Sequence, residues 1–67
     1  MKPTIGRIVH YIVGGQHLAA IIVHVWSDIC VNLISFDLNG RILPRASVLH
    51  SEYNGENTWH WSERTES

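Results

Sequence analysis

The segment with the strongest chemical character is Thr58-Trp59-His60-Trp61, near the end of the sequence. On a β-strand, alternate side chains share a face, so Trp59 and Trp61 would point one way and His60 the other. Two indoles on one face can cap the core of a small barrel or stack against a planar ligand such as a nucleobase. The sequence leaves both interpretations open, and each tryptophan could serve a different one.

Histidine is abundant, with five residues in a chain of 67, and imidazole is a common metal ligand. The sequence lacks the closely spaced His or Cys pairs that are typical of zinc sites, and it has a single cysteine. We therefore predict no metal site and no cofactor. The remaining route to a metal site would be ligands that converge from neighbouring strands. His10 and His24 are the candidates, because each lies near the middle of a predicted strand.

The residue patterns of catalytic sites are also missing from the sequence. Cys30 lies inside an apolar segment, as an inert core thiol does. The serines near a histidine in sequence show no pattern typical of a nucleophile and its base, and Gly14-Gly15 is too short to be a phosphate-binding loop. The carboxylates fall in predicted turns, where they aid solubility. We predict that the protein is not an enzyme.

A site for a small anionic nucleotide needs only two or three cations, and the sequence contains them. The candidates are Arg7, Arg41 and Arg45, since an arginine can grip a phosphate through two parallel hydrogen bonds and stack on a ring. Stacking surfaces would come from tyrosine and tryptophan, and histidine or asparagine could contact a base or a ribose. The predicted ligand-binding residues are Trp59, Trp61, Tyr53, Arg45, Arg7, His10 and Asn32.

Short strands must position these residues. Segments rich in β-branched and aromatic residues alternate with turn residues, and they predict strands over Ile5–Val13, Leu18–Trp26, Ile29–Phe36, Arg41–Leu49 and Thr58–Trp61. Gly14-Gly15 and Asn39-Gly40 predict tight turns, and Pro44 predicts an edge or a bend. An antiparallel meander of this kind closes on itself. We predict an all-β, five-stranded SH3-like barrel over residues 1–62 and a polar tail over 63–67, with an OB-type barrel as the alternative.

Length and charge narrow the class of protein further. A chain of 67 residues buries only about 60% of its unfolded surface, and small domains usually need a disulfide, a metal or self-association. A single cysteine cannot form an internal disulfide, so we expect a homo-oligomer. A formal charge of −1 argues against duplex nucleic acid as a partner. No apolar run reaches the roughly 18 residues that cross a membrane, so we expect a soluble, intracellular protein.

Four segments of the sequence form a combined pattern, namely Gly6–Tyr11, Ala20–Trp26, Val31–Leu33 and Thr58–Trp61. With this pattern, the chain from about residue 3 to residue 63 resembles a family of small proteins encoded by tailed bacteriophages and prophages. The chain departs from the family pattern at Asn57 and Ser62, where relatives have Gly and Pro. The resemblance implies a protein of the host cytoplasm that evades immunity. One such class is the sponge, which sequesters cyclic oligonucleotide or ADP-ribose-type signals of systems such as CBASS and Thoeris.

Two functional hypotheses remain. In the first, a homo-oligomer holds a small nucleotide signal at its subunit interfaces without turnover. In the second, exposed aromatic residues form a patch that inhibits a host protein. Trp, Tyr and Arg are enriched at protein–protein hot spots as well, so composition does not separate the two. A barrel that binds single-stranded nucleic acid is disfavoured by the charge balance.

Overall fold

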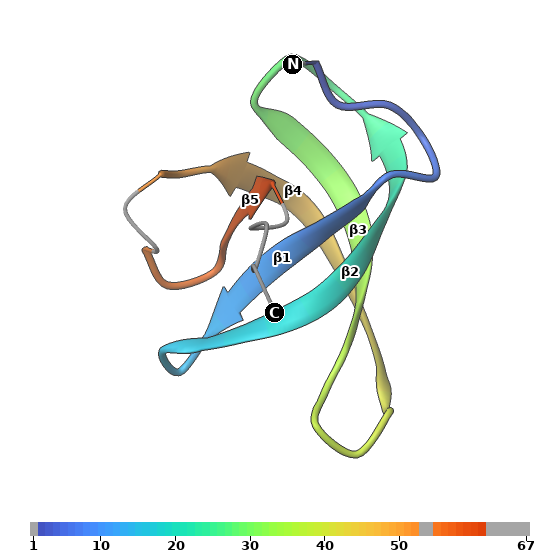
Figure 1. Cartoon of the computed structure of the whole chain (residues 1–67). Coiled ribbons are helices and arrows are strands. Elements are labelled where there is room, and N and C mark those ends of the chain that lie inside the picture. The colour runs from blue at the N-terminus through green and yellow to red at the C-terminus, as the bar shows by residue number, and fades with distance from the viewer. Residues whose placement is uncertain (1, 53–54, 62–67) are drawn as a thin grey trace, which may run out of the picture.

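The computed structural model describes residues 2–52 and 55–61, which form a closed barrel of five strands (Figure 1). The strands are β1 (Ile8–Val13), β2 (Gln16–Val25), β3 (Cys30–Phe36), β4 (Ile42–His50) and β5 (Thr58–Trp61). The prediction of an all-β, five-stranded barrel is confirmed, and the architecture is consistent with a small SH3-like barrel. Among the described residues, no helix is long and apolar enough to cross a membrane.

Alternation of side chains between the two faces of each strand builds the core. In β3, Val31, Leu33 and Ser35 are buried and their neighbours are only partly buried. Inward side chains from all five strands form one apolar cluster, which consists of Val9, Tyr11, Ala20, Ile22, Val31, Leu33, Val48 and Trp59. Ser35 is a polar residue in this interior. Its hydroxyl donates a hydrogen bond to the carbonyl of Leu43 (3.0 Å), so burial leaves it satisfied.

Both predicted tight turns are present. Gly14 and Gly15 have φ angles of 57° and 76°, the left-handed pair that a two-residue type I′ hairpin requires. The second turn is longer than a two-residue Asn-Gly hairpin. The Gly40 amide donates to the Asp37 carbonyl (2.9 Å), and the Asp37 amide donates to the Arg41 carbonyl (3.0 Å). With Gly40 at a φ of 82°, this is a type I turn followed by a bulge.

The strands differ from the predicted ones at their ends. β1 begins at Ile8 instead of Ile5, because Gly6 has a φ of 91°, which is not an extended conformation. β2 begins at Gln16, which already pairs with Val13 across the tight turn. The remaining predicted bounds lie within one residue of the observed ones.

Pro44 lies in β4 opposite Ile34 of β3. Among the described residues, β5 pairs with β4 only at Leu49 and His50. At Pro44, β4 therefore has a paired strand on one side only. This is the edge position that the sequence predicted for a residue that lacks a backbone N–H.

A bulge in β4 is centred on Asn32 of β3. Two residues of β4, Ala46 and Ser47, lie opposite this single residue. Ser47 has a left-handed φ of 53°, which is strained for a residue with a Cβ atom. The Asn32 Oδ1 accepts hydrogen bonds from the amide of Ser47 (2.8 Å) and from the indole Nε1 of Trp26 (2.9 Å). Asn32 thus holds the bulge and the indole together.

Replacing Asn32 with Ala removes the acceptor for both bonds. Because one neutral hydrogen bond contributes about 0.5–1.5 kcal/mol net, we expect N32A to lower the free energy of unfolding by about 1–3 kcal/mol. Urea unfolding followed by circular dichroism measures the loss. The matched control is Asn32→Asp, which keeps an oxygen at the same position and should retain most of the stability. Equal losses in the two variants would rule out this role of Oδ1.

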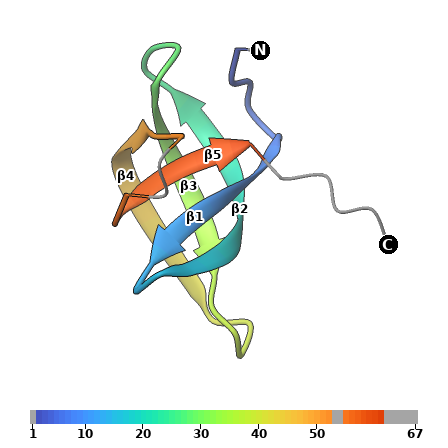
Figure 2. The ribbon, with the colours of Figure 1, turned by 60° about the vertical axis from the view of Figure 1, so that its left-hand side comes forward.

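β5 closes the barrel between β1 and β4 (Figure 2). It pairs antiparallel with β1, where Tyr11 lies opposite Trp59, and parallel with β4, where His50 lies opposite Trp59. Asn57 leads into β5 with a left-handed φ of 59°, which Asn tolerates better than most residues. Its amide donates to the Ile12 carbonyl (2.8 Å), and its Oδ1 accepts from the Tyr11 hydroxyl (3.1 Å). These bonds anchor the start of the closing strand.

Candidate functional site

Trp59 belongs to the core. Its side chain is 0% exposed, and its Nε1 donates a hydrogen bond to the carbonyl of Ile29 (3.2 Å). The rings of His50 and Trp61 pack edge-on against it, with centroids 4.7 and 5.4 Å away. A side chain without exposed surface cannot stack against a ligand. Of the two interpretations of Trp59, the structure supports the core one.

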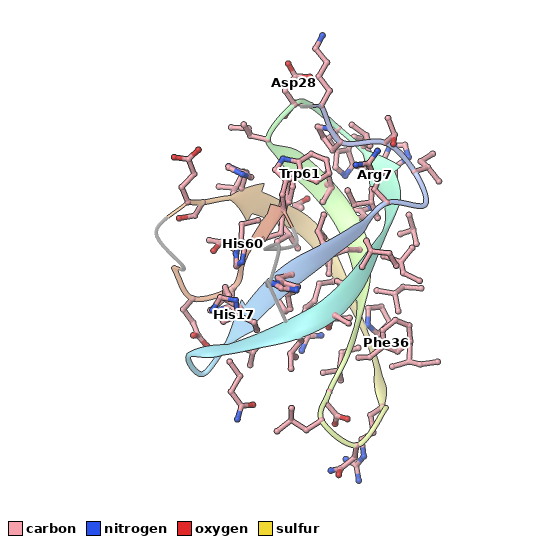
Figure 3. The ribbon with its side chains drawn as sticks, viewed as in Figure 1. Arg7, His17, Asp28, Phe36, His60 and Trp61 are labelled. Carbon is pink, nitrogen blue, oxygen red and sulfur yellow. The ribbon has the colours of Figure 1, made fainter. Side chains whose placement is uncertain are left out.

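Trp61 is half-buried, and the guanidinium of Arg7 lies over its ring. The guanidinium carbon of Arg7 lies 5.4 Å from the ring centroid, within the range of a cation–π interaction, and Figure 3 shows the two side chains next to each other. A pocket of about 290 Å³ adjoins the indole, and its other lining residues are Asp28, Ile29, His50 and Glu52. Two carboxylates in this pocket disfavour an anionic ligand there.

Arg45 and Asn32 line a second, larger groove of about 350 Å³ outside β2, β3 and β4. Its remaining lining residues are Val23, Leu33, Ile34, Pro44 and Ala46. The Arg45 Nη1 donates to the carbonyl of Pro44 (2.9 Å). Within residues 2–52 and 55–61 this bond uses one of the guanidinium's N–H donors and leaves the others for a ligand. The Asn32 Oδ1 is occupied as described above, so Asn32 would contact a ligand through its Nδ2 donors.

Trp26 lies beside this groove, because its indole is hydrogen-bonded to Asn32. It is not among the ligand contacts that the sequence predicts. Its side chain is 62% exposed, yet it is held in place. Its Nε1 binds Asn32, and its ring packs edge-on against His24 with centroids 4.4 Å apart. His24 and Asn32 are themselves directly opposite each other in the β2–β3 ladder. A large ring fixed in this way loses little conformational freedom when a base stacks on it.

A row of apolar side chains crosses the outside of the barrel from β1 to β4. Ile8 lies opposite Ile21, Ile21 opposite Ile34, and Ile34 opposite Pro44. Ile8 is 54% exposed, Pro44 is exposed, and the two inner members are partly exposed. We refer to these residues as the outer apolar face. Ile34 and Pro44 also line the groove, so the face and the groove are continuous.

Three histidines from three different strands meet at another place on the barrel. His10 of β1 lies directly opposite His60 of β5, with ring centroids 5.3 Å apart. His17 of β2 lies 5.6 Å from His10 and 4.9 Å from His60 by the same measure, and Figure 3 shows His17 and His60 close together. One possible ligand nitrogen from each ring lies within 4.8 Å of the others. We refer to these residues as the histidine cluster.

Sequence spacing could not reveal the histidine cluster. His60 is far from the other two in the sequence, and His10 and His17 are seven residues apart, which is wider than the spacing of zinc motifs. The β1–β2 and β1–β5 pairings bring the three together. The pairing that the sequence suggested, His10 with His24, does not form. His24 lies opposite Asn32 and packs on Trp26, while the neighbours of His10 across the ladders are Ala19 and His60.

The predicted ligand-binding residues therefore fall in several places. They divide into the core residue Trp59, the pair Arg7 and Trp61, the groove residues Arg45 and Asn32, and His10 in the histidine cluster. Tyr53 lies outside the described residues. Within one chain, the groove unites a cation, an amide and a neighbouring indole over apolar side chains.

Comparison with known proteins gives no match: no family model fits the sequence, and no curated protein or solved structure is significantly similar to the chain.

Proposed function

We propose that this protein is a non-enzymatic binding protein that sequesters a small nucleotide in the groove of Arg45 and Asn32. The observation that carries the proposal is the chemistry of this groove. A guanidinium suits a phosphate, amide donors suit the polar edge of a base or a ribose, and the fixed indole of Trp26 offers a stacking surface. The ligand class that we propose is the cyclic oligonucleotide or ADP-ribose-type signal of bacterial immunity. A phage-encoded sponge would lower the free concentration of this signal without altering it.

The same proposal includes self-association through the outer apolar face. Exposed apolar patches on soluble proteins mark interaction sites, and each Å² removed from water contributes about 25 cal/mol. Because Ile34 and Pro44 belong both to this face and to the groove, two copies that meet along the face would cover the groove. Excluding water from the groove would strengthen the attraction between Arg45 and a phosphate.

A thermal-shift screen tests the proposal. Cyclic dinucleotides, cyclic trinucleotides and ADP-ribose derivatives are each titrated against the full chain. A ligand that binds only the folded state stabilises it by about 2.7 kcal/mol at 100 times its Kd, so the melting temperature should rise with ligand concentration. The ligand released by heat should have an unchanged mass. No shift with any of these nucleotides, or release of a modified ligand, would contradict the proposal.

The variant Arg45→Ala locates the phosphate contact. A charge-assisted hydrogen bond contributes about 1.5–3 kcal/mol, so R45A should weaken binding about 10- to 100-fold without changing the stability of the unliganded protein. Isothermal titration with the nucleotide found in the screen measures this. The matched control is Arg41→Ala, which removes the same charge from the Asp37–Arg41 turn and should bind as the wild type does. Unchanged affinity in R45A would exclude the groove as the phosphate site.

A second candidate function is the inhibition of a host protein through an exposed patch. It is favoured by the large apolar side chains that remain exposed outside the groove, namely Ile5, Trp26, Ile29, Leu38, Ile42 and Leu49. In that case the nucleotide screen would be negative. One host protein would be recovered from lysate in stoichiometric amount, and Trp26→Ala would release it.

A further inference from the structure

We propose that the histidine cluster, His10, His17 and His60, binds a divalent transition-metal ion of the zinc type. This site is separate from the nucleotide groove: it is formed by β1, β2 and β5, whereas the groove is formed by β2, β3 and β4.

The geometry is close to that of a metal site. Zinc–nitrogen bonds are about 2.0–2.1 Å long, so two nitrogens on one tetrahedral ion are about 3.4 Å apart. The ligand atoms of the cluster lie within 4.8 Å of one another. His17 is the most exposed of the three, so it is the ligand that an ion would have to draw closer. His10 and His60 are held directly opposite each other by the β1–β5 ladder, which fixes two of the three ligands on rigid elements.

The chemical type of the ligands indicates which metal ion the cluster would bind. Within the part of the chain that the structure describes, the cluster consists of imidazoles alone, with no carboxylate and no thiolate. Imidazole suits zinc, copper, nickel and cobalt, whereas magnesium and calcium prefer oxygen ligands. The Nδ1 atom of His10 is buried and has no hydrogen-bond partner among the described residues. A buried polar atom without a partner is unfavourable, and coordination of a metal is one way in which an imidazole of this kind is satisfied.

The position of the site gives the ion a role in the fold. β5 has four residues and closes the barrel, and an ion held by His60, His10 and His17 would tie this short strand to β1 and β2. Small domains commonly depend on such a metal staple. Because His17 is exposed, the fourth position of a tetrahedral ion would be open to water or to an anionic ligand, as in three-histidine zinc sites.

Isothermal titration of the untagged, chelator-treated chain with zinc chloride tests this inference. We expect one zinc ion per chain. At zinc concentrations of about 100 times the Kd, the melting temperature should rise by roughly 10–20 °C, and magnesium chloride should produce no rise. Absence of zinc binding, or an equal response to magnesium, would overturn the proposal.

Variants identify the ligands. His17→Ala is chosen because an exposed side chain can be truncated without loss of the fold. Loss of a residue that only hydrogen-bonds to a metal ligand weakens metal binding by about 10- to 100-fold. Because His17 would itself bind the ion, H17A should weaken zinc binding by more than this. His17→Cys should recover binding, because a thiolate is also a zinc ligand. His24→Ala is the matched control and should bind as the wild type does.

Two results of this variant series would contradict the assignment. They are unchanged zinc affinity in H17A, and equal losses in H17A and H24A. Arg45→Ala should bind zinc normally, so that failure of the metal site and failure of the nucleotide groove can be told apart. The visible spectrum of the cobalt-loaded protein is a second readout: the wild type and H24A should show a tetrahedral spectrum, and H17A should not.

Discussion

Replacing Trp59 with Ala should abolish cooperative folding of the barrel. The indole is 0% exposed and lies where β5 meets both β1 and β4. Truncation of a buried tryptophan costs about 3–5 kcal/mol, and the carbonyl of Ile29 would lose its hydrogen bond from Nε1. A chain of 67 residues has a total stability of about 3–10 kcal/mol at the usual 0.05–0.15 kcal/mol per residue. The free energy lost in W59A is therefore comparable to the total stability of the protein.

Trp26→Ala is the matched control for this experiment, because its indole is 62% exposed. It should lose only the bond to Asn32 and the contact with His24, about 1 kcal/mol. Thermal unfolding followed by far-UV circular dichroism compares the two variants without relying on tryptophan fluorescence. If W59A keeps a cooperative transition within about 1 kcal/mol of the wild type, Trp59 does not close the core as described here.

Replacing Ile34 with Glu should separate the proposed oligomer into single chains. Ile34 lies in the middle of the outer apolar face, between Ile21 and Pro44. A carboxylate at this position would have to leave water when two copies meet, and taking a charge out of water costs several kcal/mol. Since Ile34 is partly exposed in the single chain, the barrel itself should stay folded.

Light scattering coupled to size exclusion measures the mass of the wild type and of I34E. The control is Leu38→Glu, which adds the same charge to a side chain that is 74% exposed in the Asp37–Arg41 turn. We expect an oligomer for the wild type and for L38E, and a single chain for I34E. A wild type that runs as a single chain, or an I34E variant of unchanged mass, would show that the outer apolar face does not mediate self-association.

The fold could be predicted from local signals because each strand is bounded by residues with strong backbone preferences. Gly14-Gly15 is followed immediately by β2, and Gly40 supplies the left-handed residue of the next turn. The bulge at Ser47 could not be predicted, because nothing about a serine in a strand indicates a positive φ. Its cause is the side chain of Asn32 on the neighbouring strand, which is a long-range contact.

The candidate site could be predicted only in part, for the same reason. The sequence predicts Arg45 and Asn32 as ligand contacts, and the β3–β4 pairing brings them to one groove. Trp59 and Trp61 do share a region of the barrel, but the sequence left open which of them is buried. The sequence marks Trp26 only as the end of a predicted strand, because its role depends on a hydrogen bond to the next strand.

The histidine cluster is the clearest example of a feature that sequence spacing hides. Zinc motifs are recognised when ligands lie close together along the chain. Here the ligands come from β1, β2 and the closing strand β5. Their proximity is decided by the register His10↔His60, and that register exists only because the barrel closes.

Native mass spectrometry of the full chain, with and without the nucleotide found in the screen, tests whether an oligomer of this barrel holds the ligand. It reports the number of chains and the mass of the bound ligand in one measurement. We expect an oligomer that carries an intact nucleotide. R45A should remain an oligomer and lose the ligand, and I34E should lose both. A wild-type protein that stays a single chain and binds no nucleotide would contradict the proposed function, and so would an R45A variant that retains the ligand.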